Sequence, residues 1–129
     1  LYLEPKSVLL NNNLGVYYFR KNNPVLAKKH FENAILRAPN KNYGVAYNNL
    51  GAIYEMERKY IIAEMFYLSS IASNFYYKAY INLIRLYLLN NDIKGAKIVL
   101  KKGLSLYPTN NELAQLYQYL YQNNSTLKK

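Results

Sequence analysis

The stretch Leu14-Gly15-Val16-Tyr17-Tyr18 opens a pattern that returns at Leu50 and again at Leu83. The two intervals are 36 and 33 residues, and each copy continues with an alanine, a large side chain and a small one. These residues are Ala27, Phe31 and Ala34 in the first copy, Ala63, Tyr67 and Ser70 in the second, and Ala96, Leu100 and Gly103 in the third. Recurrence at about 34 residues is typical of helical repeat proteins.

Each copy has the apolar spacing of two helices joined by a short turn. In the first copy Leu14 and Tyr18 lie four residues apart, on one helical face, and a second stripe begins at Ala27. Between the two stripes, Pro24 suits the first turn of a new helix. Gly15 weakens its own helix, so we expect a close helix contact there, opposite the small Ala27. The pattern predicts antiparallel helix pairs at 8–21 and 24–38, 44–57 and 60–73, and 77–90 and 93–106.

This set of residues resembles the tetratricopeptide repeat, whose Leu-Gly pair and helix-ending proline occur here at Gly15, Gly51, Pro39 and Pro108. The third copy departs from the family pattern, because Ile84 stands in place of the glycine. The resemblance covers residues 1–122 and implies an all-α, right-handed solenoid of antiparallel helix pairs. It also implies a non-catalytic protein-interaction module, a scaffold or adaptor, because such repeats are platforms for binding other proteins.

Both ends of the chain extend the repeat pattern. Residues 1–7 look like the end of a preceding repeat, with Pro5 in the place that Pro39 and Pro108 take after their helices. Residues 111–122 are expected to form one more amphipathic helix, which caps the array with a polar outer face. We therefore divide the chain into the end of a preceding repeat (1–7), three helix pairs with the capping helix (8–122) and a polar tail (123–129). We expect it to be part of a larger protein.

Few residues offer catalytic chemistry. The chain has no cysteine, one histidine (His30) and seven carboxylates. Glu55 and Glu57 lie two residues apart, so they point to different sides of their helix and make a poor acid/base pair. No glycine-rich phosphate loop is present, and no apolar run approaches the roughly 20 residues that span a bilayer. We expect no enzymatic activity, no cofactor, no metal site and no small-molecule substrate.

The formal net charge of +10 invites a nucleic-acid hypothesis. Asparagine, tyrosine, lysine and isoleucine are abundant, as AT-rich coding sequences produce, and lysine suits bidentate phosphate recognition less well than arginine. Many lysines fall on the second helix of a pair, the outer side of this architecture: Lys28, Lys29, Lys94, Lys97, Lys101 and Lys102. We interpret this face as solvated, and keep a nucleic-acid-binding helical repeat, or docking on acidic lipid, as the alternative. The compartment is undecided between cytoplasm and periplasm.

The candidate partner-binding residues lie on the first helix of each pair, which lines the concave groove in this family. They are Asn12, Val16, Phe19 and Arg20 in the first copy, Asn48 and Asn49 in the second, and Lys78, Ile81, Asn82 and Arg85 in the third. We expect these side chains to face solvent and to bind a peptide or partner segment. Apolar side chains flanked by amides and cations on a surface are suited to binding such a segment. Phe19 and Arg85 should contribute most, since aromatic and arginine anchors dominate interface energies.

One subtype of the family clamps the C-terminal carboxylate of heat-shock chaperones with two lysines, two asparagines and an arginine. Here Asn49 and Lys78 match that pattern, whereas Asn12, Val16 and Asn82 stand at the other three positions. A lysine, an asparagine and the arginine are therefore missing. We do not expect chaperone tails to be the ligand, and the identity of the partner is not readable from the sequence.

Overall fold

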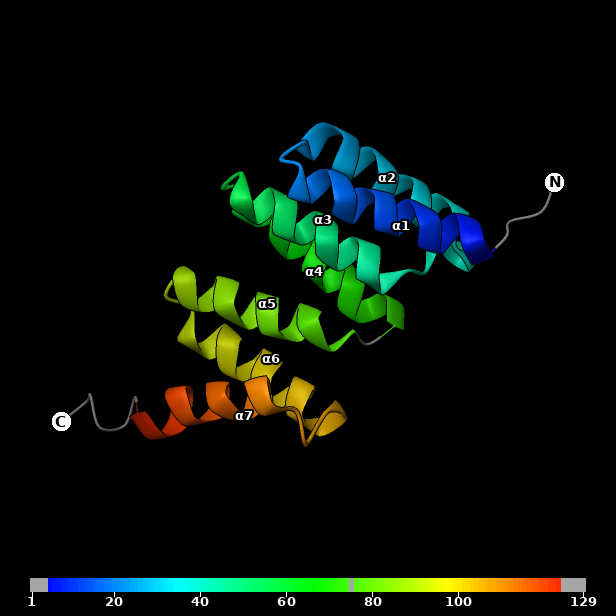
Figure 1. Ribbon diagram of the computed structural model, residues 1–129. Coiled ribbons are helices and arrows are strands. Elements are labelled where there is room, and N and C mark those ends of the chain that lie inside the picture. The colour runs from blue at the N-terminus through cyan, green and yellow to red at the C-terminus, as the bar shows by residue number, and fades with distance from the viewer. Residues whose placement is uncertain (1–4, 75, 124–129) are drawn as a thin grey trace. The chain divides into compact units, whose positions relative to one another are not determined.

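Helices make up nearly all of the described chain (Figure 1). The computed structural model describes residues 5–74 and 76–123. Every regular element in these ranges is helical: α1 Pro5–Arg20, α2 Pro24–Arg37, η1 Pro39–Lys41, α3 Gly44–Met56, α4 Tyr60–Asn74, α5 Tyr77–Leu89, α6 Ile93–Leu106, α7 Asn111–Tyr117 and η2 Gln118–Asn123. The predicted all-α class of paired helices is thus confirmed. None of the described helices combines the length and the apolar character that crossing a bilayer requires.

The chain divides into two compact units, which we describe separately: residues 1–76 and residues 77–129. In the first unit α1 packs on α2 and α3 packs on α4, and α2 also contacts α3. In the second unit α5 packs on α6, and α6 contacts α7. The first unit therefore holds two helix pairs, and the second holds the third pair with the helix that follows it.

The helix bounds agree with the predicted ranges to within one residue, except at the two ends. α1 begins at Pro5 instead of residue 8, so Pro5 opens a helix where we expected it to end one. Proline is favoured in a first helical turn because its missing N–H would have no partner there. The predicted preceding repeat also involves residues 1–4, which lie outside the described residues, and it stays a prediction.

The predicted capping helix, 111–122, is α-helical only as far as Tyr117 and continues as the π-helical η2. Asn110 caps it, since its Oδ1 accepts a hydrogen bond of 3.0 Å from the backbone N–H of Leu113. Leu113 and Leu120 are buried, which gives this segment one apolar face. Of the predicted polar tail, residues 124–129 lie outside the described part of the chain.

The turn inside each pair has the same backbone conformation. Three equivalent residues adopt left-handed φ: Asn22 at 59°, Arg58 at 62° and Asn91 at 62°. In each turn the next residue donates its N–H to the carbonyl five positions back, at 2.9, 2.9 and 2.8 Å. The left-handed residue itself donates to the carbonyl three positions back. This is the Schellman arrangement that satisfies carbonyls at a helix C-terminus, built here without glycine.

Side chains cap the second helix in two of the three pairs. The Oδ1 of Asn23 accepts from the N–H of Leu26 at 3.2 Å, and the Oδ1 of Asp92 accepts from Gly95 at 2.9 Å. Lys59 holds the equivalent position before α4, and an ammonium group cannot accept a hydrogen bond. The second pair therefore lacks both the asparagine at the left-handed position and the side-chain cap.

A glycine faces an aromatic ring in each of the first two pairs. A Cβ added to Gly15 would lie 2.5 Å from Phe31 Cε1, and one added to Gly51 would lie 2.6 Å from Tyr67 Cδ1. The predicted close contact at Gly15 therefore exists, but its partner is Phe31 and not Ala27. Ala27 is buried as well, one turn away from that ring on α2. The glycine accommodates a bulky ring that reaches across from the second helix.

A second aromatic contact also repeats in the first two pairs. Tyr18 stacks on His30 with ring centroids 5.4 Å apart, and Tyr54 stacks on Phe66 at the same separation. These pairs occupy equivalent positions on first and second helices. His30 also has its Nδ1 3.2 Å from Asn11 Oδ1, so the only histidine of the chain is half-buried between α1 and α2.

Candidate functional site

The predicted binding residues lie on α1, α3 and α5, but not all of them face solvent. Asn12, Asn48 and Ile81 are buried, with 7%, 5% and 2% of their surface exposed. The expectation that they face solvent was wrong for these three residues. It was derived from the geometry of single helices, and a single helix does not show which of its faces a neighbour covers. Arg20, Lys78 and Arg85 are exposed, as expected.

An amide pair joins the first helices of the first unit. Asn49 on α3 donates from Nδ2 to Oδ1 of Asn12 on α1, at 3.2 Å. Val16 and Phe19 are half-buried and pack against the apolar core of this unit. Asn12 and Asn49 therefore already bond each other, and Asn49 keeps only part of its hydrogen-bonding capacity for a partner.

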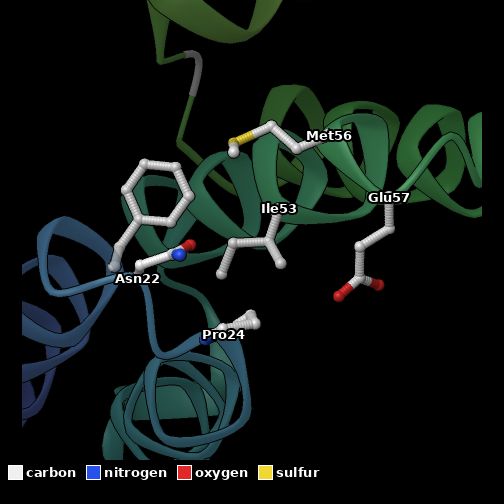
Figure 2. Close-up of a pocket in the computed structure, with 6 residues that line it drawn as sticks. Asn22, Pro24, Ile53, Met56 and Glu57 are labelled. Carbon is white, nitrogen blue, oxygen red and sulfur yellow. The ribbon is translucent and has the colours of Figure 1, made fainter.

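A cavity of about 170 Å³ opens at the turn end of α1 and α3. Its walls come from both helices and from the turn between α1 and α2: Phe19, Asn22, Pro24, Ile53, Met56 and Glu57. Figure 2 shows Ile53 between Met56 and Pro24, with the Glu57 carboxylate on the far side of Ile53 from Asn22. Met56 is 68% exposed, so its thioether forms a flexible apolar wall. The cavity offers apolar surface beside one carboxylate.

The carboxylate of Glu57 is held in place by two lysines. Lys28 Nζ lies 2.9 and 3.0 Å from its two oxygens, and Lys59 Nζ lies 3.7 Å from Oε1. The hydrogen bond from Lys28 is the main reason that the pKa of Glu57 lies below its ordinary value. Lys28 Nζ also lies 4.3 Å from the centroid of the Tyr54 ring, a cation–π contact. Lys28, which we expected on a solvated outer face, instead links α2 to the end of α3.

A cavity of about 250 Å³ in the second unit collects all four predicted residues of α5. It is lined by Lys78, Ile81, Asn82, Arg85 and Glu112. Arg85 Nη2 lies 3.5 Å from Glu112 Oε2, in an exposed ion pair. The second cavity is thus more polar than the first, with two cations, an amide and one carboxylate around a buried isoleucine.

Sequence reasoning missed several cavity residues. Asn22 lies in the turn before α2, and Pro24 is the first residue of that helix. Glu57 was considered only as one member of a poor acid/base pair, and no role was expected of Ile53. Glu112 lies in the first turn of the capping helix, which we treated only as a solvating end. Had that helix been read as the next first helix of the array, its first turn would have been expected beside the first turn of α5.

Comparison with known proteins gives matches in structure only. No protein-family model matches the chain, and no curated protein matches it in sequence. The first TPR of Spaghetti (RPAP3) bound to the HSP90 peptide SRMEEVD is similar at 21% identity and a TM-score of 0.78, over 95% of this chain and 98% of that one. The first TPR domain of human RPAP3 is similar at 22% identity and a TM-score of 0.76, over 95% and 96%.

A third structure gives the same result. The N-terminal domain of stress-induced protein-1 (STI-1) from C. elegans is 20% identical, with a TM-score of 0.75, over 92% of this chain and 99% of that one. TPR abbreviates the tetratricopeptide repeat. At these identities the similarity shows the fold alone.

Proposed function

Starting from the fold of a tetratricopeptide repeat domain, which this chain has, we propose that it is a non-catalytic protein-interaction module of a larger protein. It binds a peptide or partner segment along the first helices, the concave side in this fold. The partner supplies an apolar side chain to the cavity at Phe19, and a polar or anionic group suits the cavity at Arg85. These are two separate contact sites, one in each unit.

The observation that carries this proposal is the cavity formed by Phe19, Ile53 and Met56. An engineered apolar cavity of about 150 Å³ holds a benzene molecule, so a space of similar size can take one ring or one branched side chain. The cavity is open at the turn, and its walls are an aromatic ring, a proline and aliphatic groups. Pockets of this kind accept the anchor residues of partner peptides, and a few such anchors dominate binding energy.

The cavity of the second unit suits a different group. Lys78 and Arg85 are exposed cations that flank it, while Glu112 balances only one of them. An anionic group entering there would gain two charge-assisted hydrogen bonds, which are stronger than neutral ones. It would also compete with Glu112 for the Arg85 guanidinium.

One structural neighbour was solved with an HSP90 peptide, which supports a peptide partner in general. Two features argue against the same ligand here. Only Asn49 and Lys78 match the residues of the chaperone-tail clamp, and Asn49 is bonded to Asn12. The partner we propose is therefore a peptide with an apolar anchor, of a sequence different from the chaperone tails.

The test is a pair of double variants assayed against partners recovered by pull-down with the intact chain. Phe19→Ala with Arg85→Ala should abolish binding, since truncating each anchor costs about 2 kcal/mol, or roughly thirtyfold in affinity. The matched control, Tyr17→Ala with Arg37→Ala, removes an exposed aromatic ring and an exposed arginine from elsewhere on the first unit. Equal loss in both variants would contradict the proposal.

The salt dependence of partner binding distinguishes the proposed peptide partner from the nucleic-acid alternative. Binding to phosphates falls with salt at a slope of roughly −0.9 per contact, whereas binding carried by an apolar anchor changes little. A recovered partner that is nucleic acid, bound with a steep slope and insensitive to the Phe19 substitution, would overturn the proposed function.

A further inference from the structure

The second unit carries an uneven charge distribution. Residues 77–129 contain eight lysine or arginine residues and two carboxylates. Four of the cations lie on α6, whose helical residues include no acid: Lys94, Lys97, Lys101 and Lys102. Within the described ranges, none of these four ammonium groups lies within ion-pair distance of a carboxylate. Asp92, just before the helix, accepts the cap hydrogen bond from Gly95.

An apolar cavity of about 290 Å³ lies beside these lysines, between α6 and the α7–η2 segment. It is lined by Leu100, Lys101, Leu104, Tyr117 and Tyr121. The buried Leu100 forms its floor, and the two tyrosine rings stack with their centroids 4.7 Å apart. Lys97 Nζ lies 4.7 Å from the centroid of the Tyr121 ring. An apolar recess is thus bordered on one side by cations and on the other by tyrosines.

We propose that this lysine–tyrosine surface, formed by Lys97, Lys101, Leu104, Tyr117 and Tyr121, is a second docking site, which takes an acidic segment of another protein. One aromatic or aliphatic side chain of the segment occupies the cavity, and neighbouring carboxylates pair with Lys97 and Lys101. The cavity is roughly twice the volume that holds a benzene molecule, which is ample for a phenylalanine side chain. The excess of lysines attracts an acidic segment and speeds its encounter. This site is independent of the first-helix cavities proposed above.

The same features disfavour the two other anionic partners. A base needs an open ring face for stacking, but Tyr121 already stacks on Tyr117 and carries Lys97 over its ring. All four cations are lysines, and bidentate phosphate recognition favours arginine. A bilayer surface would use the lysines together with exposed apolar groups, and it would not need a recessed cavity. The cavity is therefore the feature that selects a peptide.

The experiment measures fluorescence anisotropy with the full chain and a labelled peptide in which one phenylalanine is flanked on each side by three glutamates. A matched peptide has glycine in place of phenylalanine, and a single-stranded oligonucleotide of equal charge and vesicles of equal parts phosphatidylserine and phosphatidylcholine are the competing probes. We expect the phenylalanine peptide to bind about tenfold more tightly than the glycine peptide, because the cavity takes the ring. Equal affinity of the two peptides would overturn the proposal.

Three variants test the site itself. Lys97→Gln with Lys101→Gln should weaken binding of the phenylalanine peptide about fivefold or more, because two positive charges are lost. The remaining binding should also depend less on salt concentration. Lys29→Gln with Lys41→Gln makes the same change in net charge on the first unit and should leave binding within about twofold if the effect is local. Leu104→Gln places a polar group in the cavity and should reduce the preference for phenylalanine over glycine, while circular dichroism verifies folding.

Several results would overturn the proposal. Equal losses from the two lysine pairs would show that net charge alone attracts the peptide. Tighter binding of the oligonucleotide or the vesicles than of the phenylalanine peptide, abolished by the Lys97 and Lys101 substitutions, would assign the surface to nucleic acid or to lipid. An unchanged phenylalanine preference in a folded Leu104→Gln variant would place the peptide outside the cavity.

Discussion

The second and third helix pairs each place a glycine beside a tyrosine ring, but on opposite helices of the pair. In the second pair the small residue is Gly51 on the first helix, and Tyr67 of the second helix lies over it. In the third pair the small residue is Gly103 on the second helix, and the ring of Tyr80 on the first helix lies beside it. The two contacts lie at different positions along their helix pairs, because Gly103 corresponds to Ser70 of the second pair. In the third pair the positions of Gly51 and Tyr67 hold Ile84 and Leu100, both of which are buried.

The two glycine–tyrosine contacts differ in how tightly the residues pack and in whether the tyrosine hydroxyl has a hydrogen-bond partner. A Cβ on Gly51 would lie 2.6 Å from the Tyr67 ring, whereas a Cβ on Gly103 would lie 3.3 Å from Tyr80. The Tyr67 hydroxyl donates to Glu55 Oε1 at 2.7 Å. The Tyr80 hydroxyl is buried and has no hydrogen-bond partner among the described residues. In the second pair the tyrosine hydroxyl therefore has a hydrogen-bond partner, and the glycine has less room for an added methyl group.

The largest expected effect comes from adding a methyl group to each glycine. Gly51→Ala should lower the free energy of unfolding by about 1–3 kcal/mol, because the buried Tyr67 ring has to move. Gly103→Ala should be neutral or should raise it by up to about 1 kcal/mol, because alanine favours the helix and the contact is only slightly tight. Urea denaturation of both variants measures the difference. Equal destabilisation would mean that the two interfaces are equally tight.

The next largest difference between the two pairs is expected when the hydroxyl of each tyrosine is removed. Tyr67→Phe should destabilise the chain by about 1.5 kcal/mol, because it breaks a partly buried hydrogen bond to a carboxylate. Tyr80→Phe should be neutral or stabilising by about 1 kcal/mol, because it removes a buried donor that lacks a partner. Thermal and urea denaturation provide the measurement. A loss on Tyr80→Phe as large as that on Tyr67→Phe would indicate a partner for the Tyr80 hydroxyl.

The Tyr67 hydroxyl also predicts a pH dependence. Burial, and then the hydrogen bond to Glu55, raise the pKa of Tyr67 above its ordinary value of 10.0. A raised pKa means that the stabilisation is fully present below the pKa of the unfolded chain and is lost as the pH rises above about 10. The Tyr67→Phe variant should lack this part of the alkaline loss. An identical alkaline profile in the variant would exclude Tyr67 as its source.

The turns are the third point of difference, with effects of about 1 kcal/mol. The third pair has Asp92 as the cap of its second helix, and the second pair has Lys59 in that place. Lys59→Asn should stabilise the chain by about 1 kcal/mol, because asparagine can accept from the first turn of α4. The reverse change in the first pair, Asn23→Lys, should cost a similar amount. Lys59 Nζ lies 3.7 Å from Glu57 Oε1 and 5.9 Å from the centroid of the Tyr54 ring. Should Lys59→Asn destabilise, these two contacts outweigh the missing cap.

The smallest effect concerns the two ion pairs. Both carboxylate oxygens of Glu57 accept a hydrogen bond from Lys28 Nζ, whereas Glu112 Oε2 lies 3.5 Å from Arg85 Nη2. Glu57→Gln should cost about 0.5–1 kcal/mol at neutral pH and low salt, and Glu112→Gln should cost nothing measurable. The pKa of Glu57 is lowered, so its stabilisation is present above its ordinary value of 4.5 and disappears as the pH falls below it. A Glu57→Gln cost that persists well below pH 4.5 would contradict an electrostatic origin.

The bounds of the paired helices were readable from the sequence because their signals are local. Pro24 and the repeated spacing of apolar positions predicted where helices begin and end. The identity of the contact at Gly15 was not readable, and we expected Ala27 where Phe31 lies. Ala27 and Phe31 are both on the inner face of α2, and only the relative shift of the two helices decides which one meets the glycine.

The candidate site was less predictable than the fold. Repeat equivalence identified the first helices, whose Phe19, Lys78 and Arg85 line two cavities that were not predicted and stay candidates for binding. It did not show that Asn12, Asn48 and Ile81 are covered by neighbouring structure. Helical periodicity gives the direction of a side chain from its own axis, and burial depends on what lies in that direction.

By itself, then, the sequence determined the class of fold, the number of helix pairs and most of their bounds, because hydrophobic spacing and prolines act within a few residues of chain. Tertiary structure decided which aromatic ring packs against which glycine. It also brought Asn12 and Asn49 within hydrogen-bond distance and placed Glu112 in the wall of the cavity at α5. Those features arise between residues tens of positions apart. Their geometry is set when helices pack, and no local pattern contains it.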